Sequence, residues 1–378
     1  MKIKEFGVER WMDRYEAVCR YNLAETCVES LTVGELLQIA GKTDTIINQL
    51  LPLKLTYGSI PGSERLRELI ASLYTSQGPD NVIVTHGAIG GNALFYQALV
   101  EPGDRVISVL PTYQQHHAIP ESLGAEVCPL RLREQNRFLP DLDELRNLLN
   151  PRTRIIALNN PNNPTGALMD EALLREIIGL AATVGAWVLC DEVYRGIDHQ
   201  GSGFTASVAD LYPRGVSTGS MSKVFSLAGL RLGWVVGPPA LLRAVTTHRD
   251  YNTISVGLLD DVFASIALEQ REEILARSRR IVTTNLQLLD RWVSTEPSVS
   301  YVKPRSGTTA LLRYRAGLTS EEFCVRLIES TGVMLTPGSA LDMEGYLRIG
   351  YANNQAVVEA GLARMSDFLA GLEQRAAS

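Results

Sequence analysis

The sequence has few cysteines and histidines, and neither residue type forms a disulfide or metal-binding pattern. Its 378 residues include five cysteines and five histidines. The cysteines are widely spaced, odd in number and without a C-x-x-C pair, which predicts reduced thiols in a cytoplasmic protein. Apart from His116 and His117 the histidines are scattered. The spacing typical of a zinc site is missing, so we expect no metal.

Long apolar runs and an excess of positive charge are also missing. No stretch of about 20 apolar residues occurs, so we expect no membrane span. The first 16 residues mix acidic and basic side chains without an apolar stretch, which argues against a secretory signal. A net charge of −6 favours solubility and argues against a nucleic-acid-binding surface.

Short strand patterns alternate with helical patterns through the middle of the chain. Ser63 and Asp141 are candidate helix N-caps. Strands that alternate with helices predict an α/β fold, in which helices cover both faces of a mainly parallel sheet. The predicted strands are 82–85, 105–109, 126–129, 154–158, 187–190, 216–218 and 233–236, and the predicted helices are 63–74, 90–100, 113–123, 141–149 and 169–184.

After about residue 250 the pattern changes to two long helical stretches, 250–269 and 271–292, followed by a compact α+β tail. We expect residues 45–284 to form a large cofactor-binding domain. Residues 1–44 and 285–378 are expected to form a smaller domain together. The tail is predicted to hold strands near 310–313, 333–335 and 346–349 and helices at 320–330 and from 355 onward.

Lys223 follows the predicted strand 216–218, and the residues around it are of types that bind phosphate. Arg231 lies eight positions further on, and its planar guanidinium can pair with a phosphate dianion. Ser220 and Ser222 offer hydroxyls to the same oxygens. Alone, such a lysine is usually a solvated surface residue, and such an arginine a surface ion pair. Together they point to a lysine that binds pyridoxal 5′-phosphate (PLP) as a Schiff base and then transfers protons.

Two further strand ends supply residues suited to the ring of PLP. Asp191 follows the buried strand 187–190, where a carboxylate is costly unless it meets a cation. A protonated pyridine nitrogen is such a cation, although an N-cap is the alternative. Tyr194 could donate to the ring hydroxyl or be a half-buried core residue. Asn163 lies in an Asn- and Pro-rich turn and is the candidate contact to the ring oxygen.

A glycine-containing turn follows the predicted strand 82–85 and opens a helix. Backbone N–H groups at a helix N-terminus bind phosphate, and here they would come from Gly87, Ala88 and Ile89. The turn fits neither the dinucleotide-binding nor the P-loop pattern. Tyr113 follows the next strand and could stack on the pyridine face, or simply pack in the core.

The order of these motifs resembles the class I and II aminotransferases of PLP fold type I, from about Leu55 to Tyr351. Any one motif is weak, but their joint occurrence in this order is specific. The motifs are Tyr57-Gly58, Pro61-Gly62, Leu66-Arg67, Thr85-His86-Gly87-Ala88, Pro102-Gly103-Asp104, Pro111-Thr112-Tyr113, Asn163-Pro164-Thr165-Gly166, Asp191-Glu192-Val193-Tyr194, Ser220-Met221-Ser222-Lys223, Gly229-Leu230-Arg231-Leu232-Gly233 and Leu347-Arg348-Ile349-Gly350.

The resemblance implies a role for each matching residue. Arg348 matches the arginine that binds the substrate α-carboxylate. Tyr57 matches a residue that reaches the phosphate of the neighbouring subunit, which implies a homodimer with shared active sites. The implied catalytic residues are Lys223, Asp191 and Tyr194. The other implied cofactor contacts are Gly87, Ala88, Tyr113, Asn163, Ser220 and Arg231, and Asn163 is also expected at the substrate.

The chemistry after proton removal from the α-carbon is left open. The resemblance favours an aminotransferase that exchanges an amino group between an amino acid and a 2-oxo acid. The chain is also similar to capreomycidine-synthase-like enzymes of antibiotic biosynthesis, which eliminate a β-hydroxyl from a hydroxylated arginine and close a ring. Glu25, Glu29 or Glu9 would then face a basic side chain, although solvated surface carboxylates are the simpler interpretation.

A third hypothesis is a PLP-binding regulator without catalysis. Regulators of this fold carry an N-terminal winged-helix domain. Only about 44 residues precede the expected large domain here, which is too few for such a domain. We therefore expect an enzyme whose partners are a small-molecule amino acid and a 2-oxo acid, without a nucleic-acid or membrane partner.

Overall fold

A seven-stranded sheet forms one part of the computed structural model, which describes residues 2–201 and 203–377. Its strands are β2 (Val82–His86), β3 (Arg105–Leu110), β4 (Glu126–Arg131), β5 (Thr153–Asn159), β6 (Trp187–Asp191), β7 (Gly215–Ser220) and β8 (Leu232–Val236). The strand order is β2-β8-β7-β6-β5-β3-β4. β8 runs antiparallel to both neighbours, and the other neighbouring pairs are parallel. This confirms the predicted α/β fold.

Both faces of this sheet are covered, as β5 illustrates. Ile155 and Ala157 pack with Phe95 on one face, whereas Ile156 and Leu158 pack on the other. Alternate side chains of a strand point to opposite faces, so an apolar run of this kind needs helices on both sides. The covering helices include α5 (Gly87–Leu99), α6 (Gln115–Ser122), α7 (Leu142–Leu148), α8 (Glu171–Val184), α9 (Val208–Leu211) and α10 (Pro239–Asp250).

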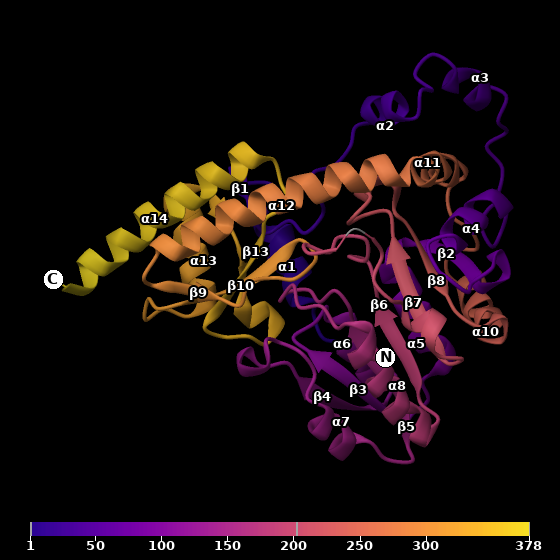
Figure 1. Ribbon diagram of the computed structural model, residues 1–378, viewed down its shortest axis with the longest axis horizontal. Coiled ribbons are helices and arrows are strands. Elements are labelled where there is room, and N and C mark those ends of the chain that lie inside the picture. Colours follow the sequence, from indigo (N-terminus) through magenta and orange to yellow (C-terminus); the bar gives the residue numbers. More distant parts are fainter. Residues whose placement is uncertain (1, 202, 378) are drawn as a thin grey trace.

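The C-terminal part forms a separate antiparallel sheet, and the N-terminal segment pairs with this part in a second, two-stranded sheet. The strand order of the antiparallel sheet is β12-β13-β10-β9, and β1 pairs in parallel with β11. Figure 1 shows α12 running from the large sheet to this part of the molecule. The domain boundaries at 45 and 284 stay a prediction. The elements are β1 (Tyr21–Asn22), β9 (Val299–Tyr301), β10 (Thr309–Tyr314), β11 (Val333–Met334), β12 (Thr336–Pro337), β13 (Tyr346–Gly350), α12 (Arg271–Thr295), α13 (Ser320–Thr331) and α14 (Gln355–Ala377).

The predicted helix at 250–269 is wrong in its first half. α10 ends at Asp250, and α11 (Leu258–Glu269) begins only at Leu258. Ile254 between them has φ +61, a left-handed conformation that a helix does not contain. The N-caps were predicted correctly: Ser63 accepts from Leu66 N–H at the start of α4 (Glu64–Ala71), and Asp141 accepts two N–H groups at the start of α7.

Three N-terminal helices were not predicted from the sequence. They are α1 (Gly7–Tyr15), α2 (Val33–Ile39) and α3 (Ile46–Leu50). Figure 1 shows α2 and α3 set apart from the sheet, beyond α11 and α12. Among residues 2–201 and 203–377, no helix is both long and apolar enough to cross a membrane.

Candidate active site

The carboxyl ends of β2, β3, β5, β6 and β7 open into one cavity of about 310 Å³, within the usual range for a ligand pocket. Loops that follow parallel strands meet at this edge of a sheet, which is why residues far apart in sequence converge here. The predicted site residues that line it are Glu25, Gly87, Ala88, Ile89, Tyr113, Asn163, Asp191, Tyr194, Ser220, Ser222, Lys223, Arg231 and Arg348.

The amine of Lys223 is enclosed by the N-terminal segment. Its Nζ donates a hydrogen bond to Thr26 Oγ1 at 2.7 Å and lies 3.5 Å from Cys27 Sγ. Burial by itself lowers the pKa of Lys223, but the ionisable groups around it, Cys27 first and then Tyr194 and Glu25, raise it above its ordinary value. Burial also raises the pKa of Cys27 to about 11, so that thiol is uncharged near neutral pH. The carboxylate of Glu25 is then the nearby charge that favours the ammonium form.

Asp191 is buried at the end of β6, with 4% of its surface exposed. Its Oδ2 accepts a hydrogen bond from Asn92 Nδ2 at 3.0 Å and lies 3.4 Å from His116 Nε2. Thr218 Oγ1 donates a hydrogen bond to Asn92 Oδ1 at 2.8 Å and so fixes the orientation of this amide. These contacts fix the carboxylate in a position where it faces the cavity. Sequence reasoning missed Asn92 and His116, because they lie on α5 and α6 with no local pattern to mark them.

A cluster of N–H and hydroxyl donors lines the same cavity near the start of α5. Gly87 begins α5, and a Cβ there would lie 3.4 Å from Arg231 Nη2. Arg231 Nη1 also lies 3.5 Å from Ser222 Oγ. A Cβ at Gly233 would lie 2.4 Å from Ala88 N, so only glycine lets β8 approach the start of α5. The result is a positively charged pocket at a helix N-terminus, which suits a phosphate.

Tyr194 presents an unsatisfied hydroxyl to the cavity. Its side chain is 2% exposed, and within the described part of the chain its Oη has no hydrogen-bond partner. Burial raises the pKa of Tyr194, although Lys223 and the nearby Thr26 hydroxyl lower it, so the hydroxyl keeps its proton and remains a donor. A buried polar atom without a partner costs free energy, which indicates that a ligand completes this contact.

Arg348 is a buried cation without a carboxylate partner among the described residues. It is 3% exposed, and burial lowers the pKa of its guanidinium. Nη2 donates to Ala24 O and Thr336 Oγ1, both at 2.9 Å, and Nη1 lies 3.5 Å from Asn163 Oδ1. Nε has no partner in the described chain. A buried guanidinium held by neutral groups remains available for a ligand carboxylate.

Besides Asp191, three carboxylates of the N-terminal segment line the same cavity: Glu9, Glu16 and Glu25. Burial and then Glu25 and Glu9 raise the pKa of Glu16, as expected for like charges placed close together. Glu29, the third carboxylate considered from the sequence, does not line the cavity. It lies 3.9 Å from Arg277 and accepts from Asn354 Nδ2, so the hypothesis that it faces substrate is dropped.

Tyr113 and Tyr57 occupy contrasting positions. Tyr113 lines the cavity, packs against the ring of Phe6 at 4.7 Å between centroids and donates to Glu9 Oε1 at 2.7 Å. Tyr57 is 72% exposed and lies outside the cavity. Its expected contact is with a second subunit, and that contact stays a prediction.

The cavity residues fit PLP. A half-buried lysine amine, a buried carboxylate, an unpartnered tyrosine hydroxyl and a cationic helix N-terminus match the aldehyde, ring nitrogen, ring hydroxyl and phosphate of that cofactor. The described residues contain no group of three or more His, Cys, Asp or Glu side chains arranged to hold a metal ion.

Three comparisons relate the chain to known proteins. The sequence model of the protein family aminotransferase class I and II matches residues 47–365. Capreomycidine synthase of Streptomyces vinaceus is 31% identical over 367 residues, 96% of this chain and 93% of that protein. The structure of a PLP-dependent aminotransferase from Streptococcus suis 89-1591 has 40% identity and a TM-score of 0.95 over 98% and 99% of the two chains. The PLP-dependent cyclase OrfR has 28% identity and a TM-score of 0.90 over 98% of each chain.

Proposed function

The chain belongs to the aminotransferase class I and II family, and on that premise we propose that it exchanges an amino group between an L-amino acid and a 2-oxo acid. The family is PLP-dependent, and its substrates are amino acids. The observation that carries the proposal is the cavity in which Lys223, Asp191 and Arg348 meet. These residues supply a nucleophilic amine, a fixed anion and a carboxylate-binding cation.

We propose one role for each group around the cofactor. Lys223 is the residue that holds PLP, and the carboxylate of Asp191 balances the protonated ring nitrogen. Tyr194 and Asn163 contact the ring oxygen, and Tyr113 covers the ring. Support comes from their convergence on one cavity.

We assign the phosphate to the part of the cavity at the start of α5. The proposed donors are the hydroxyls of Ser220 and Ser222, the guanidinium of Arg231 and the first N–H groups of α5, from Gly87 to Ile89. Their support is the cationic cluster at the start of α5.

The protein's own part in the reaction is to hold the amino acid and move a proton. When bound, PLP withdraws electrons from the α-carbon of the amino acid. Arg348 orients the substrate by its α-carboxylate, and the amine of Lys223 removes the α-proton as a general base. Because this amine lies in a buried cavity, bulk water competes little for the proton.

A second candidate function is elimination followed by ring closure on a hydroxylated basic amino acid. It is favoured by the three carboxylates that the N-terminal segment brings to the cavity, Glu9, Glu16 and Glu25, which suit a cationic side chain. Capreomycidine synthase and the cyclase OrfR are relatives whose names fit this chemistry. Both candidates require the same removal of the α-proton. Transamination then releases a keto acid, whereas the cyclase reaction expels a β-hydroxyl.

A product assay separates the two candidates. The holoenzyme would be incubated with a panel of amino acids, including arginine and 3-hydroxyarginine, with a 2-oxo acid present. We expect a keto acid from the substrate and a new amino acid from the acceptor, both detected by mass spectrometry. Agmatine, the amine that lacks the α-carboxylate, is the matched control and should react poorly because it cannot pair with Arg348. Loss of water without a keto acid would reject transamination and support the cyclase.

We also propose that the protein is a homodimer with shared active sites. The segment around α3 exposes large apolar side chains, including Leu51, Leu55 and Tyr57, and exposed apolar patches of this kind mark protein interfaces. We expect sedimentation at twice 41.5 kDa. Leu55→Asp should dissociate the dimer, whereas Tyr57→Phe should keep it and weaken PLP binding by about tenfold, the effect of one lost hydrogen bond. A monomer that retains PLP fully would contradict this proposal.

A further inference from the structure

Three consecutive residues of the N-terminal segment contact Lys223. Thr26 Oγ1 accepts a hydrogen bond from Lys223 Nζ at 2.7 Å, and Cys27 Sγ lies 3.5 Å from the same nitrogen. The N–H of Val28 donates to the backbone oxygen of Lys223 at 3.3 Å. Both the side-chain amine and the backbone of Lys223 are therefore held against this segment.

The backbone of this segment is held without help from the Thr26 hydroxyl. The Glu25 carboxylate accepts from the N–H groups of Thr26 at 2.6 Å and Cys27 at 2.8 Å. Thr308 Oγ1 donates to the carbonyl oxygen of Thr26 at 2.7 Å. A Cβ on Gly350 would lie 1.8 Å from the carbonyl oxygen of Glu25, so the turn lies directly on β13. Removing the Thr26 hydroxyl should leave these contacts in place.

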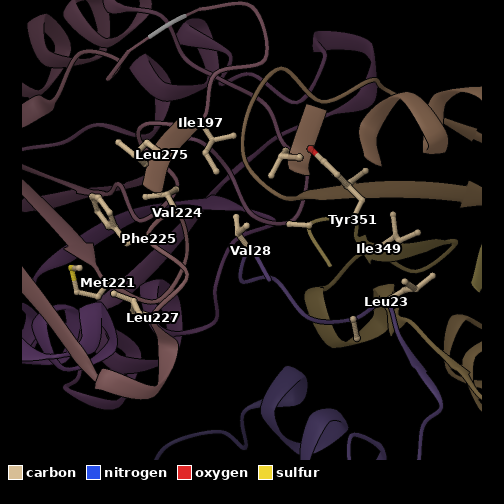
Figure 2. Packing of buried hydrophobic residues seen from close by; sticks show 14 of the residues in the cluster. Leu23, Val28, Ile197, Met221, Val224, Phe225, Leu227, Leu275, Ile349 and Tyr351 are labelled. Atoms are coloured by element: carbon tan, nitrogen blue, oxygen red, sulfur yellow. The ribbon is translucent and has the colours of Figure 1, made fainter. Parts of the chain in front are cut away.

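Packing also fixes the segment between two parts of the protein. Figure 2 shows Val28 between Val224 and Phe225, which follow Lys223, and Tyr351, which follows β13. All four side chains are buried in the same hydrophobic cluster. The segment is therefore a rigid support that sets the position of the Thr26 hydroxyl relative to the lysine.

We propose that Thr26 is a positioning residue that holds the amine of Lys223 whenever this amine is not bonded to the cofactor. The inference rests on the proposed function, in which Lys223 carries PLP and later moves a proton. A lysine amine on a flexible four-carbon stem samples many positions. A hydroxyl fixed by a rigid turn selects one of them, and proton transfer depends on that placement.

Cys27 and Glu25 have different parts in this arrangement. The thiol of Cys27 is uncharged near neutral pH because burial raises its pKa to about 11, so it supplies a neutral contact. Burial alone would raise the pKa of Glu25, but Lys223 and the N–H of Cys27 lower it. Glu25 therefore stays ionised and both closes the turn and favours the ammonium form of Lys223.

The test compares Thr26→Val, which keeps the branched shape, with Thr26→Ser, which restores the hydroxyl. One readout is the pH dependence of covalent PLP uptake by the apoenzyme, followed by visible absorbance. Losing a hydrogen-bond acceptor disfavours the ammonium form, so the profile of Thr26→Val should shift to lower pH. A second readout is turnover with α-deuterated substrate. We expect kcat about tenfold lower, KM unchanged and a larger isotope effect, all restored by Thr26→Ser.

Thr308→Val is the control for a loosened turn, because it removes a bond to the Thr26 backbone and leaves the Thr26 hydroxyl. The inference is supported if Thr26→Val shifts the uptake profile and Thr308→Val does not. It is overturned if both variants shift it equally or if Thr26→Val matches the wild type. Borohydride reduction and peptide mapping distinguish failure of the inference about Thr26 from failure of the proposed function. PLP found on another lysine would reject the proposed function itself.

Discussion

Replacing Lys223 with alanine should abolish covalent attachment of PLP and lower turnover by on the order of 10²- to 10⁴-fold, the usual contribution of a general base. Both effects have one cause, because the same amine is proposed to bond the cofactor and to remove the α-proton. Borohydride reduction followed by peptide mass spectrometry measures the attachment, and keto-acid formation measures the turnover.

Lys223→Arg is the matched control. It keeps a positive charge at the position, but a guanidinium is not deprotonated in proteins and neither bonds PLP nor accepts a proton. We therefore expect this variant to fail as Lys223→Ala does. A reduced PLP label on a different lysine, or turnover by Lys223→Ala within a few-fold of wild type, would show that another residue carries the chemistry.

Replacing Asp191 with asparagine should lower kcat by about 10²- to 10³-fold, in the range found for loss of one preorganised electrostatic contact. Asparagine preserves the shape of the side chain but removes the negative charge that is proposed to keep the ring nitrogen protonated. PLP should still attach to Lys223, because the attachment does not require this charge. Turnover and peptide mapping of the same sample separate the two effects.

His116→Phe provides a comparison for the Asp191 prediction. Its imidazole lies 3.4 Å from the Asp191 carboxylate without itself lining the cavity. The variant should lower kcat much less than Asp191→Asn, because the charge remains and Asn92 still donates to it. Normal turnover by Asp191→Asn would refute the assigned role of the carboxylate.

The fold was predictable because its strands are short, apolar and separated by helical patterns. Strand β5, predicted at 154–158, is buried on both faces, as expected for a central parallel strand. The helix predicted at 250–269 was wrong because an apolar helical pattern does not reveal the break at Ile254, where the backbone takes a left-handed conformation. The small N-terminal helices were missed, although α2 begins with a capping box between Thr32 and Glu35, which is a local signal of a helix start.

The cavity was predictable only where a motif marked it. Lys223, Asp191 and Arg348 each follow or lie in a strand with a recognisable pattern, and the structure brings them to one cavity. Thr26 contacts Lys223 from 197 positions away, and His116 lies 75 positions before Asp191. Threonine and histidine at these positions have no local pattern, so only the folded chain shows which group they contact.

The sequence by itself determined the order of strands and helices and the residue types that end each strand, because hydrophobic periodicity and side-chain chemistry are local properties. Tertiary structure decided which groups face Lys223 and Asp191. It also decided that Glu25 reaches the cavity and Glu29 does not. Contacts of this kind depend on how distant segments pack. Thr26 is placed by Glu25, Thr308 and Gly350 together, and no single stretch of sequence contains that information.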